Sequence, residues 1–132
     1  MVDKTTTMYL SLLDHIAKFV KLDHDETNTL LTYLDHHVVK KKGHLLVEGQ
    51  ICNAQYFIVK GVFRQYIINE KGNEQTIQFG IENWWMTDFL SFQSHAPSNF
   101  YIQAVENAEV IIIEKDALER RARSHPETRA LF

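Results

Sequence analysis

From residue 35 onward, the chain is a series of short apolar runs separated by turn residues. The runs are rich in β-branched and aromatic residues, and pairs such as Lys42-Gly43 and Lys60-Gly61 lie between them. They comprise residues 38–39, 45–47, 56–59, 62–63, 66–68, 76–79, 101–105 and 110–113. Many short strands at nearly regular spacing predict a mainly β domain of jelly-roll type, a double-stranded β-helix. Residues 69–73 predict a hairpin turn, with Gly72 available for a positive φ.

Helical patterns precede and follow these strands. Leu10, Leu13 and Ala17 fall on one helical face, and Asp23 can cap a second helix. After the last strand, Asp116 can cap a further helix. We therefore expect flanking α-helices: N-terminal helices over residues 8–34, the jelly roll over 35–114, and the start of a C-terminal helix over 116–132.

The stretch from Phe79 to Ile102 interrupts the β pattern. Met86, Phe89 and Leu90 stand at i, i+3 and i+4, which predicts a short helix with an apolar face. Pro97 then ends the helical pattern. A strand, a small helix, a polar turn and a strand form a plausible pocket wall. Its polar groups would come from the helix N-terminus near residues 87–88 and from the turn at residues 98–99.

Composition restricts the class of protein. The chain has 132 residues, of which 45% are apolar and 23% charged, as expected for one globular domain. Its formal charge of −3 argues against broad nonspecific affinity for nucleic acids. Cys52 is the only cysteine, which excludes an internal disulfide and a four-cysteine zinc site. The chain shows neither a signal pattern nor an apolar run of membrane-spanning length, so we expect a cytoplasmic protein with no membrane partner.

Several motifs, in the same order, resemble a known family. Residues 45–50 (Leu-Leu-Val-Glu-Gly-Gln) and 56–61 (Tyr-Phe-Ile-Val-Lys-Gly) form the first motif, and residues 79–102 form the second. Residues 107–116 and 125–127 resemble a last strand and the start of a long helix. Together they resemble the sensor domain of the Crp/Fnr family of bacterial transcription regulators, a cyclic nucleotide-binding domain. The resemblance covers nearly the whole chain.

The resemblance assigns roles to the central stretch. The family's cassette has Gly-Glu, nine residues, and then Arg followed by Ser or Thr; the glutamate takes the ribose hydroxyl and the arginine the cyclic phosphate. Here Thr87 and Asp88 stand at the first pair, and Ser98 and Asn99 at the second. Ser98 cannot replace a charged, bidentate guanidinium, and losing such a buried pair costs about 3–5 kcal/mol. The resemblance thus implies an effector-sensing domain with a degenerate cyclic-nucleotide site, and we assign no cofactor.

The candidate ligand-binding residues are Phe79, Trp85, Thr87, Asp88, Phe89, Ser98 and Asn99. Trp84, Trp85 and Phe92 either line an apolar pocket for a different ligand or fill that pocket. We assign no catalytic residue and no metal ligand. The resemblance further implies a small-molecule effector and a homodimer formed through the C-terminal helix. DNA binding would require a helix-turn-helix that this chain does not contain.

Two other hypotheses and some simpler roles remain open. One hypothesis is a small cupin-like metal-dependent enzyme, suggested by His36, His37 and His44, although adjacent residues of a strand point to opposite faces and the cupin ligand spacing is absent. The other is a ligand-free dimerisation module. Asp88 can also serve simply as a helix cap, and Ser98 and its neighbour as turn residues.

Overall fold

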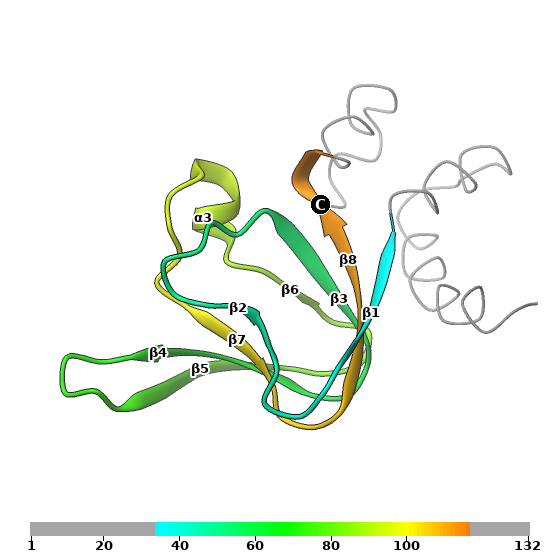
Figure 1. The fold of residues 1–132 in the computed structure, drawn as a ribbon, viewed down its shortest axis with the longest axis horizontal. Coiled ribbons are helices and arrows are strands. Elements are labelled where there is room, and N and C mark those ends of the chain that lie inside the picture. The colour runs from blue at the N-terminus through cyan, green and yellow to red at the C-terminus, as the bar shows by residue number, and fades with distance from the viewer. Residues whose placement is uncertain (1–33, 117–132) are drawn as a thin grey trace, which may run out of the picture.

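The computed structural model describes residues 34–116, so all but one residue of each helical region expected over residues 8–34 and 116–132 lies outside the described residues (Figure 1). The described chain forms two four-stranded antiparallel sheets. The first sheet consists, in spatial order, of β1 (Asp35–Val39), β8 (Ala108–Glu114), β3 (Ala54–Lys60) and β6 (Trp85–Met86). The second consists of β2 (His44–Leu46), β7 (Tyr101–Ala104), β4 (Phe63–Ile68) and β5 (Glu74–Gly80). The predicted mainly β jelly roll is confirmed.

The core lies between the two sheets. Each strand turns alternate side chains inward, and the inward set includes Ile58, Phe63, Ile102 and Val110, which are fully buried. Gly80 lies where β5 meets the first sheet. A Cβ at this position would lie 2.4 Å from the sulfur of Met86, so the absence of a side chain lets the two sheets approach there.

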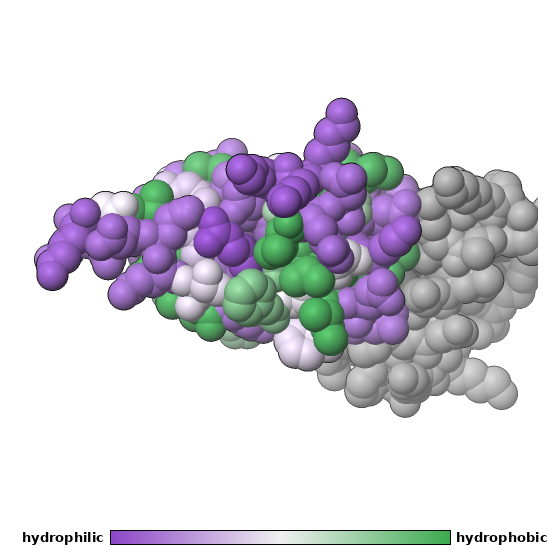
Figure 2. All heavy atoms as spheres, turned by 90° about the horizontal axis from the view of Figure 1, so that it is seen from below, coloured by the Kyte–Doolittle hydropathy of each residue, from purple (hydrophilic) through white to green (hydrophobic). Residues whose placement is uncertain are grey.

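The β4–β5 hairpin extends beyond the rest of the two sheets (Figure 1), and its tip is hydrophilic (Figure 2). The turn between the strands is organised by Asn69, whose side-chain oxygen accepts from the N–H groups of Lys71 and Asn73, both at 3.0 Å. Gly72 has a φ of 82°, which confirms the predicted positive φ in this turn.

One prediction for the central stretch is wrong. Met86 does not belong to the helix but to β6, where it lies opposite Tyr56 of β3 and is buried. The helix α3 (Phe89–Ser94) begins later, and its Phe89 and Leu90 are 58% and 74% exposed. Pairing with a strand 30 residues away in the sequence therefore overrides the local helical spacing of Met86.

We expect Phe63→Ala to destabilise the domain by about 3–5 kcal/mol, because it removes a fully buried aromatic ring and leaves a cavity. The matched control is Phe79→Ala on the paired strand β5, where the ring is 54% exposed and the expected loss is below about 1 kcal/mol. Urea unfolding of both variants measures the difference. Equal losses would contradict this assignment of inner and outer faces.

Candidate ligand site in the cassette between β6 and β7

Residues 87–100, here called the cassette, connect β6 to β7 and contain α3. The helix is capped at both ends by local bonds. Asp88 is the N-cap in an extended conformation, and its Oδ1 accepts from the N–H of Ser91 at 3.3 Å. His95 is the C-cap with a φ of 60°, and its N–H donates to the carbonyl of Ser91 at 2.9 Å. The helix N-terminus predicted near residues 87–88 is confirmed.

A hydrogen bond joins the beginning and the end of the cassette. The hydroxyl of Ser98 donates to Oδ2 of Asp88 at 2.5 Å, and both residues are buried, at 2% and 6% exposure. The same Ser98 oxygen accepts from the N–H of Phe100 at 3.0 Å. The pair is thus a short bond between a carboxylate and a hydroxyl inside the protein. The two side chains expected to contact a ligand contact each other.

The loop between β2 and β3 holds the main chain of the cassette in place. Ser98 accepts from the N–H of Gly49 at 2.9 Å and donates its own N–H to the carbonyl of Gln50 at 2.7 Å. Three cassette N–H groups, those of Ser91, Ser98 and Phe100, therefore already have acceptors within the protein. These three groups are therefore not free to donate to the phosphate of a ligand.

A second set of bonds attaches the cassette to the start of β3. The hydroxyl of Thr87 donates to the carbonyl of Ala54 at 2.8 Å and lies 3.2 Å from the sulfur of Cys52. The N–H of Cys52 donates to the hydroxyl of Ser91 at 2.9 Å, and that hydroxyl donates to the carbonyl of Ala96 at 2.6 Å. Cys52 is 1% exposed. Sequence reasoning missed the roles of Cys52 and Ser91, because neither belongs to a recognisable motif.

The structure brings together three of the seven predicted site residues: Thr87, Asp88 and Ser98. The other two predicted cassette residues, Phe89 and Asn99, are exposed. The exposed ring of Phe89 makes the helix surface apolar without contributing to the core.

The two aromatic residues predicted from outside the cassette lie on outer faces of the sheets. Phe79 pairs with Arg64, whereas the adjacent pair, Phe63 and Gly80, faces the core. Trp85 pairs with Phe57, and their rings meet at a centroid distance of 5.1 Å on the face of β3 opposite the core. Neither residue is on the inner faces that surround the sandwich interior.

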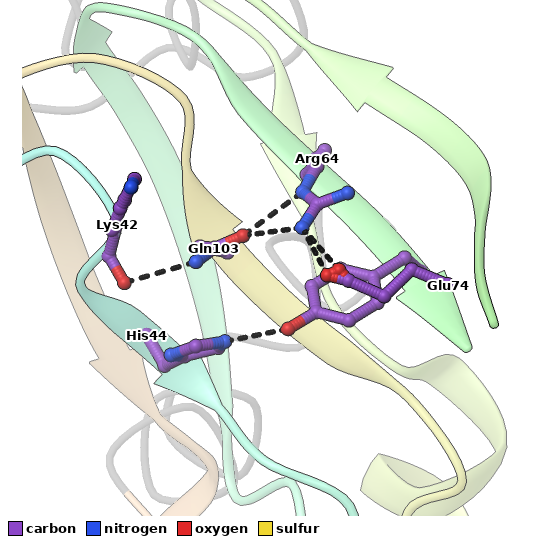
Figure 3. A network of polar contacts seen from close by, with 6 residues as sticks. Lys42, His44, Arg64, Glu74 and Gln103 are labelled. Atoms are coloured by element: carbon purple, nitrogen blue, oxygen red, sulfur yellow. Dashed lines mark hydrogen bonds and ion pairs between the residues drawn. The ribbon is translucent and has the colours of Figure 1, made fainter. Parts of the chain in front are cut away.

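Arg64, the one arginine between residues 34 and 116, is held outside the sandwich (Figure 3). Its guanidinium donates to both carboxylate oxygens of Glu74 at 3.0 Å and to the side-chain oxygen of Gln103 at 2.7 Å. It also lies 4.0 Å above the ring of Tyr66. No arginine of the described chain therefore reaches the cassette, in agreement with the absence of arginine from the cassette sequence.

The interior beside the cassette carries one more polar group, the hydroxyl of Tyr56. It donates to the carbonyl of Leu45 at 3.3 Å. Burial, reinforced by Cys52, raises the pKa of Tyr56 far above its ordinary value. This hydroxyl is therefore a neutral donor throughout the physiological pH range and supplies no positive charge for a phosphate.

The histidines considered for a metal do not converge. His37 lies 2.8 Å from the carboxylate of Asp35, and His44 lies 2.8 Å from the hydroxyl of Tyr66 (Figure 3). Within residues 34–116, no three His, Cys, Asp or Glu side chains are grouped so that they could hold a metal ion. In the same part of the chain, no helix is long and apolar enough to cross a membrane.

A family model described as the cyclic nucleotide-binding domain matches residues 36–125. The match covers more than half of the chain, so the protein belongs to this family. The resemblance inferred from the sequence is thereby confirmed. No curated protein sequence matches the chain.

Solved structures with the same fold include sensor domains of transcription regulators. A cyclic nucleotide-binding domain from Methylobacillus flagellatus has a TM-score of 0.79 and 18% identity, covering 95% of this chain and 72% of that one. The sensor domain of the regulator DNR from Pseudomonas aeruginosa has a TM-score of 0.78 and 19% identity, covering 95% and 83%. The Thermus thermophilus catabolite activator protein has a TM-score of 0.72 and 18% identity, with 85% of this chain covered. This chain spans about half of that activator, 52% of its length.

We expect Ser98→Ala to destabilise the domain by about 1.5–3 kcal/mol, because it leaves the buried carboxylate of Asp88 without its hydroxyl donor. The matched control is Ser94→Ala in the same cassette. Its exposed hydroxyl bonds only to neighbouring main chain, and its loss changes stability by about 0.5 kcal/mol or less. Denaturant unfolding compares the two. A Ser98→Ala variant as stable as the control would show that the buried bond contributes nothing.

Proposed function

We propose that the chain is the effector-sensing regulatory domain of a Crp/Fnr-type transcription regulator with a degenerate cyclic-nucleotide site. The observation that carries this proposal is the buried bond between Asp88 and Ser98. By the resemblance, these two positions would contact the ribose and the phosphate of a cyclic nucleotide. Here the hydroxyl of Ser98 binds the carboxylate of Asp88. Ser98 stands where the family motif has its arginine, so an uncharged hydroxyl replaces the guanidinium.

The bond has a chemical consequence for any ligand that approaches the cassette. A cyclic nucleotide would bring its phosphate toward the carboxylate of Asp88 without a cation to offset the repulsion. Losing the charged partner costs about 3–5 kcal/mol, which weakens binding by roughly two to four orders of magnitude. A ligand that displaces Ser98 must itself donate a hydrogen bond to Asp88. This requirement favours a hydroxyl- or amine-bearing molecule without a phosphate.

In the proposed mechanism, an effector shifts the population between two arrangements of the cassette relative to the C-terminal helix. That shift would bias a homodimer formed through this helix, in the cytoplasm of a bacterium. In such a regulator, DNA would be contacted by a helix-turn-helix. No catalytic step is involved.

Thermal unfolding with cyclic AMP and cyclic GMP tests the degenerate site. A ligand that binds only the folded state adds about 2.7 kcal/mol at a hundredfold excess over Kd. At 1 mM nucleotide, which is on the order of the Kd expected without the arginine, we expect the natural protein to be stabilised by no more than about 0.5 kcal/mol. The variant Thr87→Gly/Asp88→Glu/Ser98→Arg restores the family's cassette residues and is expected to gain a response.

The control for that variant carries Ser98→Gln with the same two other substitutions, which keeps a long polar side chain but no charge. Its failure to respond would assign the gain to the guanidinium. Stabilisation of the natural protein by about 2 kcal/mol or more with either nucleotide at 1 mM would overturn the degenerate site. A restored variant that does not respond would show that residues other than Asp88 and Ser98 obstruct the site.

A ligand-free dimerisation module is the second candidate, favoured by the same internal bond, because Asp88 and Ser98 satisfy each other's polar groups. A panel of hydroxyl- and amine-bearing metabolites in the unfolding assay separates the two. Stabilisation by one of them identifies an effector, whereas no response to the panel favours the module.

A further inference from the structure

Lys115, the residue after β8, reaches across to the C-terminal end of α3. Its ammonium donates to the carbonyl of Phe92 at 2.6 Å and, more weakly, to that of Gln93 at 3.4 Å. It also lies 5.3 Å from the ring centroid of Phe92. The main chain of Lys115 is fixed separately, because its N–H donates to the carbonyl of Asn53 at 2.7 Å. The side chain thus spans from the end of the first sheet to the cassette helix.

This contact supplies a positive charge at the C-terminal end of α3, which the sequence of the helix lacks. The last carbonyls of a helix have no partner within the helix and carry partial negative charge, so a cation there is stabilising. The last turn of α3 contains no basic residue. Lys115, more than 20 residues away in the sequence, provides the cation instead.

The same ammonium lies 3.1 Å from Nε2 of His95, the C-cap of α3. An ammonium group has three donors and no acceptor, so this contact requires a lone pair on Nε2. The contact fits the tautomer of the imidazole that carries its proton on Nδ1. A protonated imidazole would offer a second N–H and a positive charge to Lys115, and the contact would become repulsive.

We propose that Lys115 and His95 form a proton-sensitive latch that holds the cassette helix against the end of β8. Histidine is the side chain whose charge ordinarily changes between pH 5 and 8. At neutral pH the latch is closed, because Lys115 binds both the helix carbonyls and the imidazole. Protonation of His95 sets two cations side by side, and Lys115 then withdraws from the helix end.

His95 is the one member of the latch whose type of side chain ordinarily changes its charge between pH 5 and 8. Within the cassette, the other titratable side chain is Asp88, which lies at the opposite end of α3 and binds Ser91 and Ser98. From the β2–β3 loop, the carboxylate of Glu48 accepts from the hydroxyl of Tyr101. Glu114 and Asp116 flank Lys115 in the chain. The bonds of Asp88 and Glu48 are thus with serine and tyrosine partners and not with His95.

The latch connects the proposed sensing site to the chain that follows β8. Lys115 and Asp116 are helical and stand where the C-terminal helix is expected to begin, so one side chain links the position of α3 to this start. This consequence for signalling rests on the proposed function. The latch itself consists only of contacts between described residues, and its test does not depend on any ligand.

Amide hydrogen exchange of the full chain, followed by NMR at pH 5.0 and 7.5 and corrected for intrinsic rates, tests the latch. We expect the protection of the last-turn amides, those of Gln93, Ser94 and His95, to fall about tenfold at pH 5.0, as for loss of one charge-assisted bond. Amides of β3 serve as an internal reference and should keep their protection.

Two variants make the result specific. His95→Asn cannot acquire charge but still tolerates the left-handed conformation, so the pH dependence should disappear while α3 remains capped. Lys115→Met keeps the length of the side chain without its charge, and protection should be low at both pH values. Lys115→Arg should retain the high protection at pH 7.5.

A natural protein whose α3 protection is the same at both pH values would overturn the proposal. So would an unchanged pH dependence in His95→Asn, because the proton would then act elsewhere. Failure of the nucleotide experiment above leaves these outcomes unaffected, since no ligand is present in the exchange measurement.

Discussion

A short buried bond between a carboxylate and a hydroxyl sets the form of the cassette. Asp88 caps the helix with one oxygen and accepts from Ser98 with the other, so the same side chain fixes both the start of α3 and the return of the chain toward β7. Because Asp88 is buried, losing either hydrogen bond would cost free energy, since a carboxylate away from water needs its partners. The remaining contacts of the cassette depend on the two ends being joined in this way.

Around this bond, the cassette is attached to both sheets. The β2–β3 loop holds Ser98 by its main chain, and Lys115 at the end of β8 holds the far end of α3. The outer face of α3, with Phe89 and Leu90, stays exposed. The cassette is therefore held in place by bonds to other residues of the same domain. Its sequence lacks the arginine that the family motif has there.

Local signals in the sequence predicted the local features. The strand pattern gave the jelly roll, the Asn69–Asn73 turn was foreseen from its glycine, and the helix start was foreseen near Asp88. Contacts between distant segments were not predictable from spacing. Met86 was misplaced because its partner is Tyr56 in another strand, and nothing in the sequence indicates that Lys115 meets Phe92.

The sequence also did not predict which face of a sheet each side chain occupies. Phe79 was expected at the site, yet β5 pairs with β4 so that Phe79 lies beside Arg64 on the outer face, while the adjacent pair, Phe63 and Gly80, faces the core. Trp85 follows its partner Phe57 in the same way. A period of two residues predicts which side chains share a face, but it does not say which face is inside.

The internal bond of the cassette also bears on how such a protein persists in a cell. A sensor that needs its effector to complete a buried polar site gains stability from that effector, and its abundance then follows the effector's concentration through degradation of the unfolded chain. Here Ser98 supplies the partner permanently. On the proposed function, newly made chains would therefore not need an effector to complete this buried polar pair as they fold.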